Sequence, residues 1–260
     1  MKKILLALTA VAAMTGAASA ADLAAKPYVK APVPAPVANW TGFYIFGGGG
    51  GGLWAADQHV QTTGTNAALT VDQRQGGSGW FGTVGAGYDW QFSGTWVAGV
   101  FADGQFGSIK GTLQDPIAGW TGQVKMEDAW AVGVRLGWLA APNVLTYVNG
   151  GYSGSHWSGE TLLGTISGLP AGAHTNSFNR NGWFIGGGVE NSLNFFGITS
   201  PGLFMKTEYR AAYYNRVTLP ETLPTGLPDG FAHTFNPWVQ TITTSLVYRF
   251  NWTGPVVAKY

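Results

Sequence analysis

The sequence predicts an all-β protein: an eight-stranded antiparallel up-and-down transmembrane β-barrel with short periplasmic turns and long extracellular loops. Three observations carry this prediction. The chain begins with an export signal, and no later stretch reaches the roughly 18 uncharged apolar residues of a spanning helix. Only 10% of the residues are charged, against about 25% in ordinary domains, whereas glycine (40) and tryptophan (12) are abundant. Apolar residues also alternate with small or polar ones, as in strands with one face in lipid.

The first 20 residues have the three parts of a secretory signal peptide. A basic start, Met1–Lys3, precedes an apolar run over 4–14, and an A-x-A cleavage motif ends at Ala20. The run is too short for a membrane anchor, which needs about 20 residues. We therefore expect cleavage between Ala20 and Ala21. The chain contains no cysteine, which excludes disulfides and thiolate metal sites.

Residues 21–38 are rich in proline and alanine. The prolines exclude a helix or the interior of a sheet, so this segment is expected to be an extended periplasmic tether. The barrel is then expected over 39–250, and residues 251–260 form a C-terminal extension.

The segment from Trp80 to Phe92 shows the alternation that predicts strands. Its even positions are apolar with aromatic ends, and its odd positions are small or polar. Trp80 and Trp90 share a face, and at about 3.3 Å per residue and about 45° tilt they lie roughly 23 Å apart, close to the ~25 Å between aromatic girdles. The pattern recurs at 129–139 and 238–250. The expected girdle comprises Trp80, Trp90, Trp130, Trp138, Trp238 and Phe250.

The connections between the expected strands alternate in length. Those at 93–95 and 140–143 are short, whereas 107–126, 155–181 and 215–236 are long. This alternation is typical of an outer-membrane barrel with both termini in the periplasm. A soluble β-sandwich need not alternate and would carry more surface charge. The expected strands are residues 40–54, 80–92, 96–106, 127–139, 144–154, 182–193, 202–214 and 237–250, of which the first and fifth have the least distinct faces.

The six consecutive glycines at 47–52 lie between aromatic residues. A phosphate loop would continue with Lys-Ser or Lys-Thr, but Leu53 and Trp54 follow. A flexible linker would have polar neighbours. We expect these glycines to form part of the barrel wall, where missing side chains permit close packing and sharp coiling.

Several motifs, in order along the chain, resemble the opacity-type outer-membrane β-barrel proteins of alphaproteobacterial envelopes. They are AADL after the signal, NWTGFYIFGG at 39–48, GWFIGGGVE at 182–190, MKTEYRAAYY at 205–214 and SLVYRF at 245–250. The resemblance implies an eight-stranded barrel, mostly without enzyme activity, of the kind described as porins, surface antigens or structural envelope proteins.

The C-terminus departs from many outer-membrane barrels, in which the last aromatic residue of the final strand ends the chain and signals for assembly. Here Phe250 is followed by NWTGPVVAKY, so either Phe250 or Tyr260 is the expected assembly signal. The repeated Asn-Trp-Thr-Gly at 39–42 and 251–254 predicts that each end of the chain places a tryptophan at the periplasmic interface, where the first and last strands meet.

The charged residues within the expected strands fall mainly on inward faces, because Arg or Lys at the lipid midplane costs about 2–4 kcal/mol. They could line a selective pore or neutralise each other and close the lumen. Four acids and four bases favour the closed lumen, since a selective pore usually has an excess of one sign. The expected lumen residues are Asp89, Asp103, Arg135, Glu190, Lys206, Glu208, Arg210 and Arg249.

The histidines are expected to be solvated in external loops. Ser155-His156 with Glu160 suggests a lipid hydrolase, but neighbouring loop side chains do not define a triad. No D-x-D-x-D-G calcium loop is present. We therefore expect no catalytic residues, no metal and no cofactor. The histidines are His59, His156, His174 and His233.

The sequence thus predicts a non-enzymatic structural or surface protein of the Gram-negative outer membrane. The alternatives are a small porin and, more remotely, a lipid-modifying enzyme. The expected partners are outer-membrane lipid or lipopolysaccharide, the barrel-assembly machinery and, through the N-terminal tether, peptidoglycan. A net charge of +1 gives no indication of nucleic-acid binding.

Overall fold

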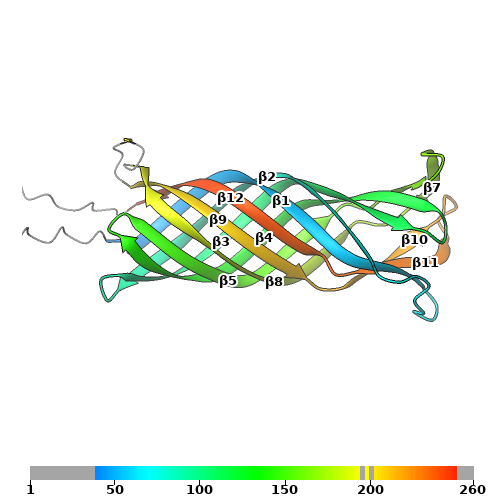
Figure 1. Ribbon diagram of the computed structural model, residues 1–260, viewed down its shortest axis with the longest axis horizontal. Coiled ribbons are helices and arrows are strands. Elements are labelled where there is room, and N and C mark those ends of the chain that lie inside the picture. The colour runs from blue at the N-terminus through cyan, green and yellow to red at the C-terminus, as the bar shows by residue number, and fades with distance from the viewer. Residues whose placement is uncertain (1–38, 194–196, 199–201, 251–260) are drawn as a thin grey trace, which may run out of the picture. The chain divides into compact units, whose positions relative to one another are not determined.

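The computed structural model describes residues 39–193, 197–198 and 202–250, almost entirely as antiparallel β-strands (Figure 1). The predicted signal peptide with Ala20 and Ala21, the tether, Trp252 and Tyr260 lie outside the described residues. Within them, no helix is long and apolar enough to cross a membrane. The strands are β1 (Gly42–Thr62), β2 (Gln73–Phe92), β3 (Trp96–Asp115), β4 (Trp120–Ala141), β5 (Val144–Trp157), β6 (Thr161–Gly164), β7 (Pro170–His174), β8 (Phe178–Ser192), β9 (Leu203–Tyr214), β10 (Val217–Thr222), β11 (Pro228–Phe235) and β12 (Trp238–Arg249).

The long strands close on themselves into a cylinder, here called the first ring. β1 pairs with β2, and the pairing continues through β3, β4, β5, β8 and β9 to β12. β12 returns to β1, with Ala55 opposite Trp238 and Tyr44 opposite Arg249. A closed ring leaves no unpaired edge, which is the condition for β-structure in hydrocarbon.

The described sheet has twelve strands, where eight were expected. The four additional short strands form a second ring that shares β1–β4 with the first. β4 pairs with β6, and the path continues through β7, β10 and β11 back to β1. The contact between β7 and β10 is a single residue pair, His174 opposite Thr222. The second ring lies at the end of the molecule that carries β7, β10 and β11 (Figure 1).

The segments 55–79, 107–126, 155–181 and 215–236, expected as long loops, are largely strand. β1 continues to Thr62 rather than residue 54, and β2 begins at Gln73 rather than residue 80. The expectation was wrong because the outward residues here are polar, so the apolar face ends before the hydrogen-bond ladder does. Asp57 and Arg74 are directly paired across β1 and β2 in this polar part.

The sheet separates an aromatic interior from an apolar outer surface. Tyr44, Phe101 and Phe184 are buried inside the first ring, whereas Trp80 and Ile242 on its outer face are 80% and 60% exposed. A soluble domain rarely exposes such a continuous apolar surface. An apolar band around a closed ring is the surface that a lipid bilayer requires.

The glycine run lies within β1, as predicted for a piece of wall. A Cβ atom on Gly48 would overlap the carbonyl oxygen of Thr244, and one on Gly50 would overlap that of Ile242. On the other face, a Cβ on Gly47 would meet only ordinary contacts at 3.8 Å. The inward glycines therefore let β12 coil closely against β1.

Candidate functional site

The interior of the first ring holds the eight charged side chains that the sequence places in the lumen. All of them are buried, with at most 7% of their surface exposed. β9 supplies Lys206, Glu208 and Arg210 at successive inward positions, and the other five come from different strands. Those five are Asp89 on β2, Asp103 on β3, Arg135 on β4, Glu190 on β8 and Arg249 on β12.

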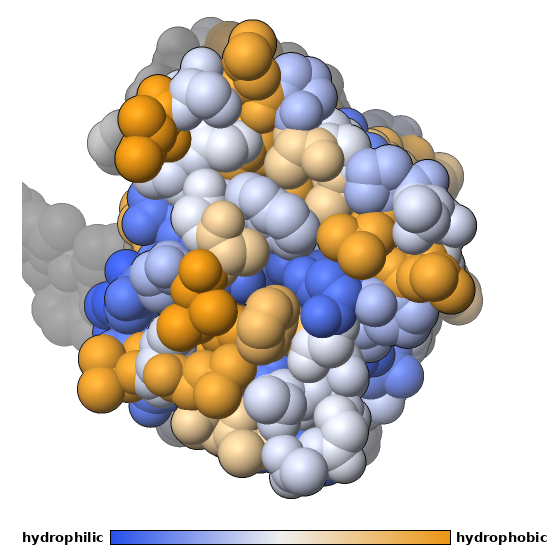
Figure 2. Space-filling model, turned by 90° about the vertical axis from the view of Figure 1, so that its right-hand side faces the viewer, coloured by the Kyte–Doolittle hydropathy of each residue, from blue (hydrophilic) through white to orange (hydrophobic). Residues whose placement is uncertain are grey.

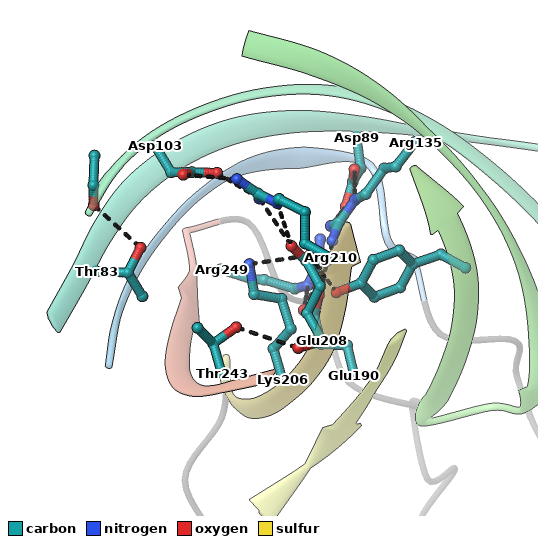
Figure 3. Close-up of polar contacts among 12 residues, drawn as sticks. Thr83, Asp89, Asp103, Arg135, Glu190, Lys206, Glu208, Arg210, Thr243 and Arg249 are labelled. Atoms are coloured by element: carbon teal, nitrogen blue, oxygen red, sulfur yellow. Dashed lines mark hydrogen bonds and ion pairs between the residues drawn. The ribbon is translucent and has the colours of Figure 1, made fainter. Parts of the chain in front are cut away.

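Four of these residues form a square of alternating charge, here called the arginine square (Figure 3). Arg135 donates from Nε to Asp89 Oδ1 at 2.8 Å and from Nη1 to Glu190 Oε2 at 3.1 Å. Arg249 donates from Nη2 to Asp89 Oδ2 and from Nε to Glu190 Oε1, both at 2.8 Å. Each carboxylate therefore binds both arginines, and the cluster has no net charge.

The other four residues form a second cluster, here called the β9 cluster. Arg210 binds both oxygens of Asp103 at 3.0 and 2.7 Å, and its Nη2 also donates to Glu208 Oε1 at 2.8 Å. Tyr147 donates its hydroxyl to Glu208 Oε2 at 2.8 Å, and Lys206 Nζ lies 3.8 Å from the same oxygen. This cluster too contains two acids and two bases.

Aromatic rings fill the space around the cations. The guanidinium carbon of Arg135 lies 4.4 Å from the centre of the Tyr44 ring, and that of Arg210 lies 4.5 Å from Phe184. Beside Arg210 and Tyr214 a cavity of about 10 Å³ remains, room for about one water molecule. The lumen at this level is therefore occupied by paired charges and rings.

Trp40 is part of this filling and not of the outer belt. The sequence placed it at the periplasmic interface, but it is buried, and the guanidinium of Arg249 lies 4.4 Å from its ring. Its backbone NH donates to Gln91 Oε1 at 2.7 Å. Its Nε1 donates to the carbonyl of Pro142 in the short turn after β4, so Trp40 lies at the expected end of the barrel. Its side chain points inward rather than to the membrane surface, because Trp40 has the same parity as the buried Tyr44 and Phe46.

The predicted girdle residues face outward. Trp80 and Trp90 on β2 are 80% and 63% exposed, so projecting rings mark the two ends of the apolar part of this strand, which itself begins at Gln73. The other four are Trp130, Trp138, Trp238 and Phe250, all of them exposed. Of the two candidate assembly signals, Phe250 follows β12 directly, and Tyr260 lies outside the described residues.

A second buried polar group, which the sequence did not indicate, lies in the second ring. His233 on β11 is fully buried: its Nε2 lies 2.7 Å from Glu221 Oε1, and its Nδ1 lies 2.7 Å from Gln58 Nε2. Burial raises the pKa of Glu221 to about 7. Burial lowers the pKa of His233, but the adjacent Glu221 and the nearby Glu160 outweigh it, so the net shift is upward.

The expectation that all four histidines are solvated loop residues was therefore wrong. His59, His156 and His174 lie in β1, β5 and β7, and His233 is buried. The sequence FAHTF could have identified His233. Its residues still alternate as in a strand, with the histidine on the same side as the two phenylalanines, but the other side has no large apolar residues. Figure 2 shows this end of the molecule, where hydrophilic residues lie between projecting hydrophobic ones.

The arrangement of Ser155, His156 and Glu160 does not form a catalytic triad. Ser155 Oγ accepts from Trp157 Nε1 at 2.8 Å, and His156 Nδ1 lies 2.6 Å from Asn179 Oδ1. Among the described residues, no group of three or more histidine, aspartate or glutamate side chains could hold a metal ion.

Comparisons with known proteins agree with this architecture. The chain matches no protein-family model. It is 27% identical over 199 residues to the 31 kDa outer-membrane immunogenic proteins of Brucella melitensis biotype 1 and Brucella suis biovar 1, covering 75% of this chain and 82% of each relative. The crystal structure of OprG from Pseudomonas aeruginosa matches with a TM-score of 0.55 and 12% identity, over 82% of this chain and 98% of OprG. Fold and sequence similarity together support an outer-membrane β-barrel protein of a Gram-negative bacterium.

Proposed function

We propose that this chain is a non-enzymatic structural and surface protein of the outer membrane, an eight-stranded barrel of the opacity type with a closed lumen. One observation carries the proposal: all eight inward charges bind one another in two neutral clusters among aromatic rings. An ion passing through would have to separate buried pairs, and leaving one partner unpaired costs several kcal/mol. The clusters also show no excess of one sign that would select an ion.

The proposed orientation places the second ring outside the cell and the short turns in the periplasm, together with both termini. Its support is that the turns after β2 and β4 span only residues 93–95 and 142–143, as is usual on the periplasmic side. The proposed partners are outer-membrane lipid and lipopolysaccharide, the barrel-assembly machinery at Phe250 or Tyr260, and peptidoglycan at the mature N-terminus. For the last of these, mass spectrometry of muramidase digests is expected to show muropeptides attached to Ala21.

Single-channel recording in planar bilayers tests the closed lumen. The refolded mature protein, checked by heat-modifiable gel migration, is expected to show no steady current. The double variant Arg135→Ala, Arg210→Ala should conduct cations, because it removes the cation that bridges the acids in each cluster. Lys110→Ala, an exposed residue of β3, is the matched control and should remain silent. Steady, salt-dependent steps from the unmodified protein would replace this proposal with the small porin.

A further inference from the structure

A long groove runs along the outer wall of the first ring, across β9, β12, β1 and β2. Its volume is about 640 Å³. Gly49 and Gly51 are part of its lining and leave it without side chains there, and Trp80, Tyr209 and Ile242 are among its other lining residues. These three side chains are exposed. Under the orientation proposed above, the groove lies in the outer half of the membrane, just below the aromatic residues Tyr213 and Trp238.

The groove contains hydrogen-bonding groups that are unusual on a lipid-facing wall. The Tyr209 hydroxyl donates to Gln240 Oε1 at 2.7 Å. The hydroxyl of Thr244, another lining residue, lies 3.3 Å from that of Thr207 on the neighbouring strand. The side-chain nitrogen of Gln240 has no hydrogen-bond partner among the described residues. Polar groups in hydrocarbon are costly without partners, so this wall suits a ligand that is apolar but carries hydroxyl or carbonyl groups at this depth.

A polar pocket of about 290 Å³ continues the groove toward the second ring. The strand register connects the two: Leu53 in the groove is opposite Gln240, and two residues further along Ala55 in the pocket is opposite Trp238. An acyl chain in the groove therefore places its head group in this pocket.

Two arginines line the polar pocket. Arg216 donates from Nε to Asn236 Oδ1 at 3.1 Å, which leaves its two terminal nitrogens without a partner among the described residues. Arg74 is exposed and has only a long 3.9 Å contact with Asp57. The other acid, Asp72, is 2.9 Å from His59 Nδ1. The pocket thus offers two guanidinium groups, the side chains best suited to a phosphate.

We infer that the groove and the pocket form one binding site for a phosphorylated, acylated glycolipid of the lipid A type. An acyl chain lies over Gly49 and Gly51 and contacts Trp80, and a phosphate binds Arg74 and Arg216. The hydroxyl of Tyr209 and the amide of Gln240 bind the polar groups that join the acyl chain to the head group. The site depends on the proposed function, because that function sets its depth in the membrane. It does not require the lumen to be closed.

Native mass spectrometry of the folded full-length mature protein, released from detergent micelles, tests the site. The probes are bis-phosphorylated lipid A, its dephosphorylated form and phosphatidylglycerol. Gly51→Leu fills the groove without disturbing the wall, because a Cβ there would lie 3.6 Å from the Trp80 ring. Arg74→Gln with Arg216→Gln removes the phosphate contacts. The matched controls are Ala102→Leu, on the outer face of β3, and the charge change Lys110→Gln.

We expect Gly51→Leu to weaken binding of both lipid A forms. The double arginine variant should weaken the phosphorylated form about tenfold or more, as for the loss of charge-assisted hydrogen bonds, and leave the dephosphorylated form unchanged. Both controls should bind as the unmodified protein does. Equal loss in the controls, or phosphatidylglycerol binding as tightly as lipid A, would overturn the inference. A conducting barrel that still binds lipid A would refute only the closed lumen.

Discussion

Replacing Arg135 by methionine tests whether the arginine square holds the barrel together. Arg135 binds Asp89 and Glu190 and lies against the Tyr44 ring, all inside the first ring. Methionine keeps the apolar part of the side chain but leaves Arg249 as the only cation bound to the two buried carboxylates. Removing one partner of a buried pair costs about 3–5 kcal/mol, and we expect the free energy of unfolding to fall by this amount.

Urea unfolding of the barrel in lipid vesicles, followed by tryptophan fluorescence and by heat-modifiable migration, measures this change. Lys110→Met on the exposed face of β3 is the control and should stay within about 0.5 kcal/mol of the unmodified protein. Adding Asp89→Asn to Arg135→Met restores neutrality, with Glu190 and Arg249 still paired, and should recover part of the loss. The reasoning fails if Arg135→Met unfolds like the control, or if the added Asp89→Asn deepens the loss.

Three further outcomes are expected. Glu221 and His233 bind protons more tightly in the folded protein than in the unfolded chain. The stability that these protons give the fold is therefore complete below about pH 4.5 and is lost as the pH rises through about 7. Hydrogen exchange in β10 and β11, corrected for its intrinsic pH dependence, should be faster at about pH 8 than at about pH 5. Glu221→Gln should reduce this difference. Equal exchange rates at both pH values would contradict the prediction. Gly48→Val should prevent folding in a heat-modifiability assay, whereas Gly47→Val should fold, because only the first collides with β12. Tyr147→Phe should lower the free energy of unfolding by about 1.5–3 kcal/mol through the lost bond to Glu208, and an unchanged urea midpoint would count against that bond.

The sequence predicted the direction of side chains better than their partners. Asp89 and Arg135 could be placed inside because a charge cannot face lipid, and the period of two then assigns the whole strand. Their pairing could not be predicted, since it depends on the register of β2 against β3 and of β3 against β4. The second ring was missed because hydrophobic alternation reports lipid contact, and it stops at Asp57 although β1 does not.

In the proposed orientation, the second ring also determines which parts of the chain an external protease can cut. Proteases bind an extended segment of several residues that is free of its neighbours, and paired strands do not offer one. At the second-ring end, such a segment is the short tip at 223–227. The longer tip at 63–72 is tied to β1, where the Leu69 NH donates to the Val60 carbonyl at 2.8 Å. The single pair between His174 and Thr222 is where the ring opens most readily. Foreign peptides for surface display should therefore be tolerated at 223–227, whereas an insertion within β10 would break its pairing with β7.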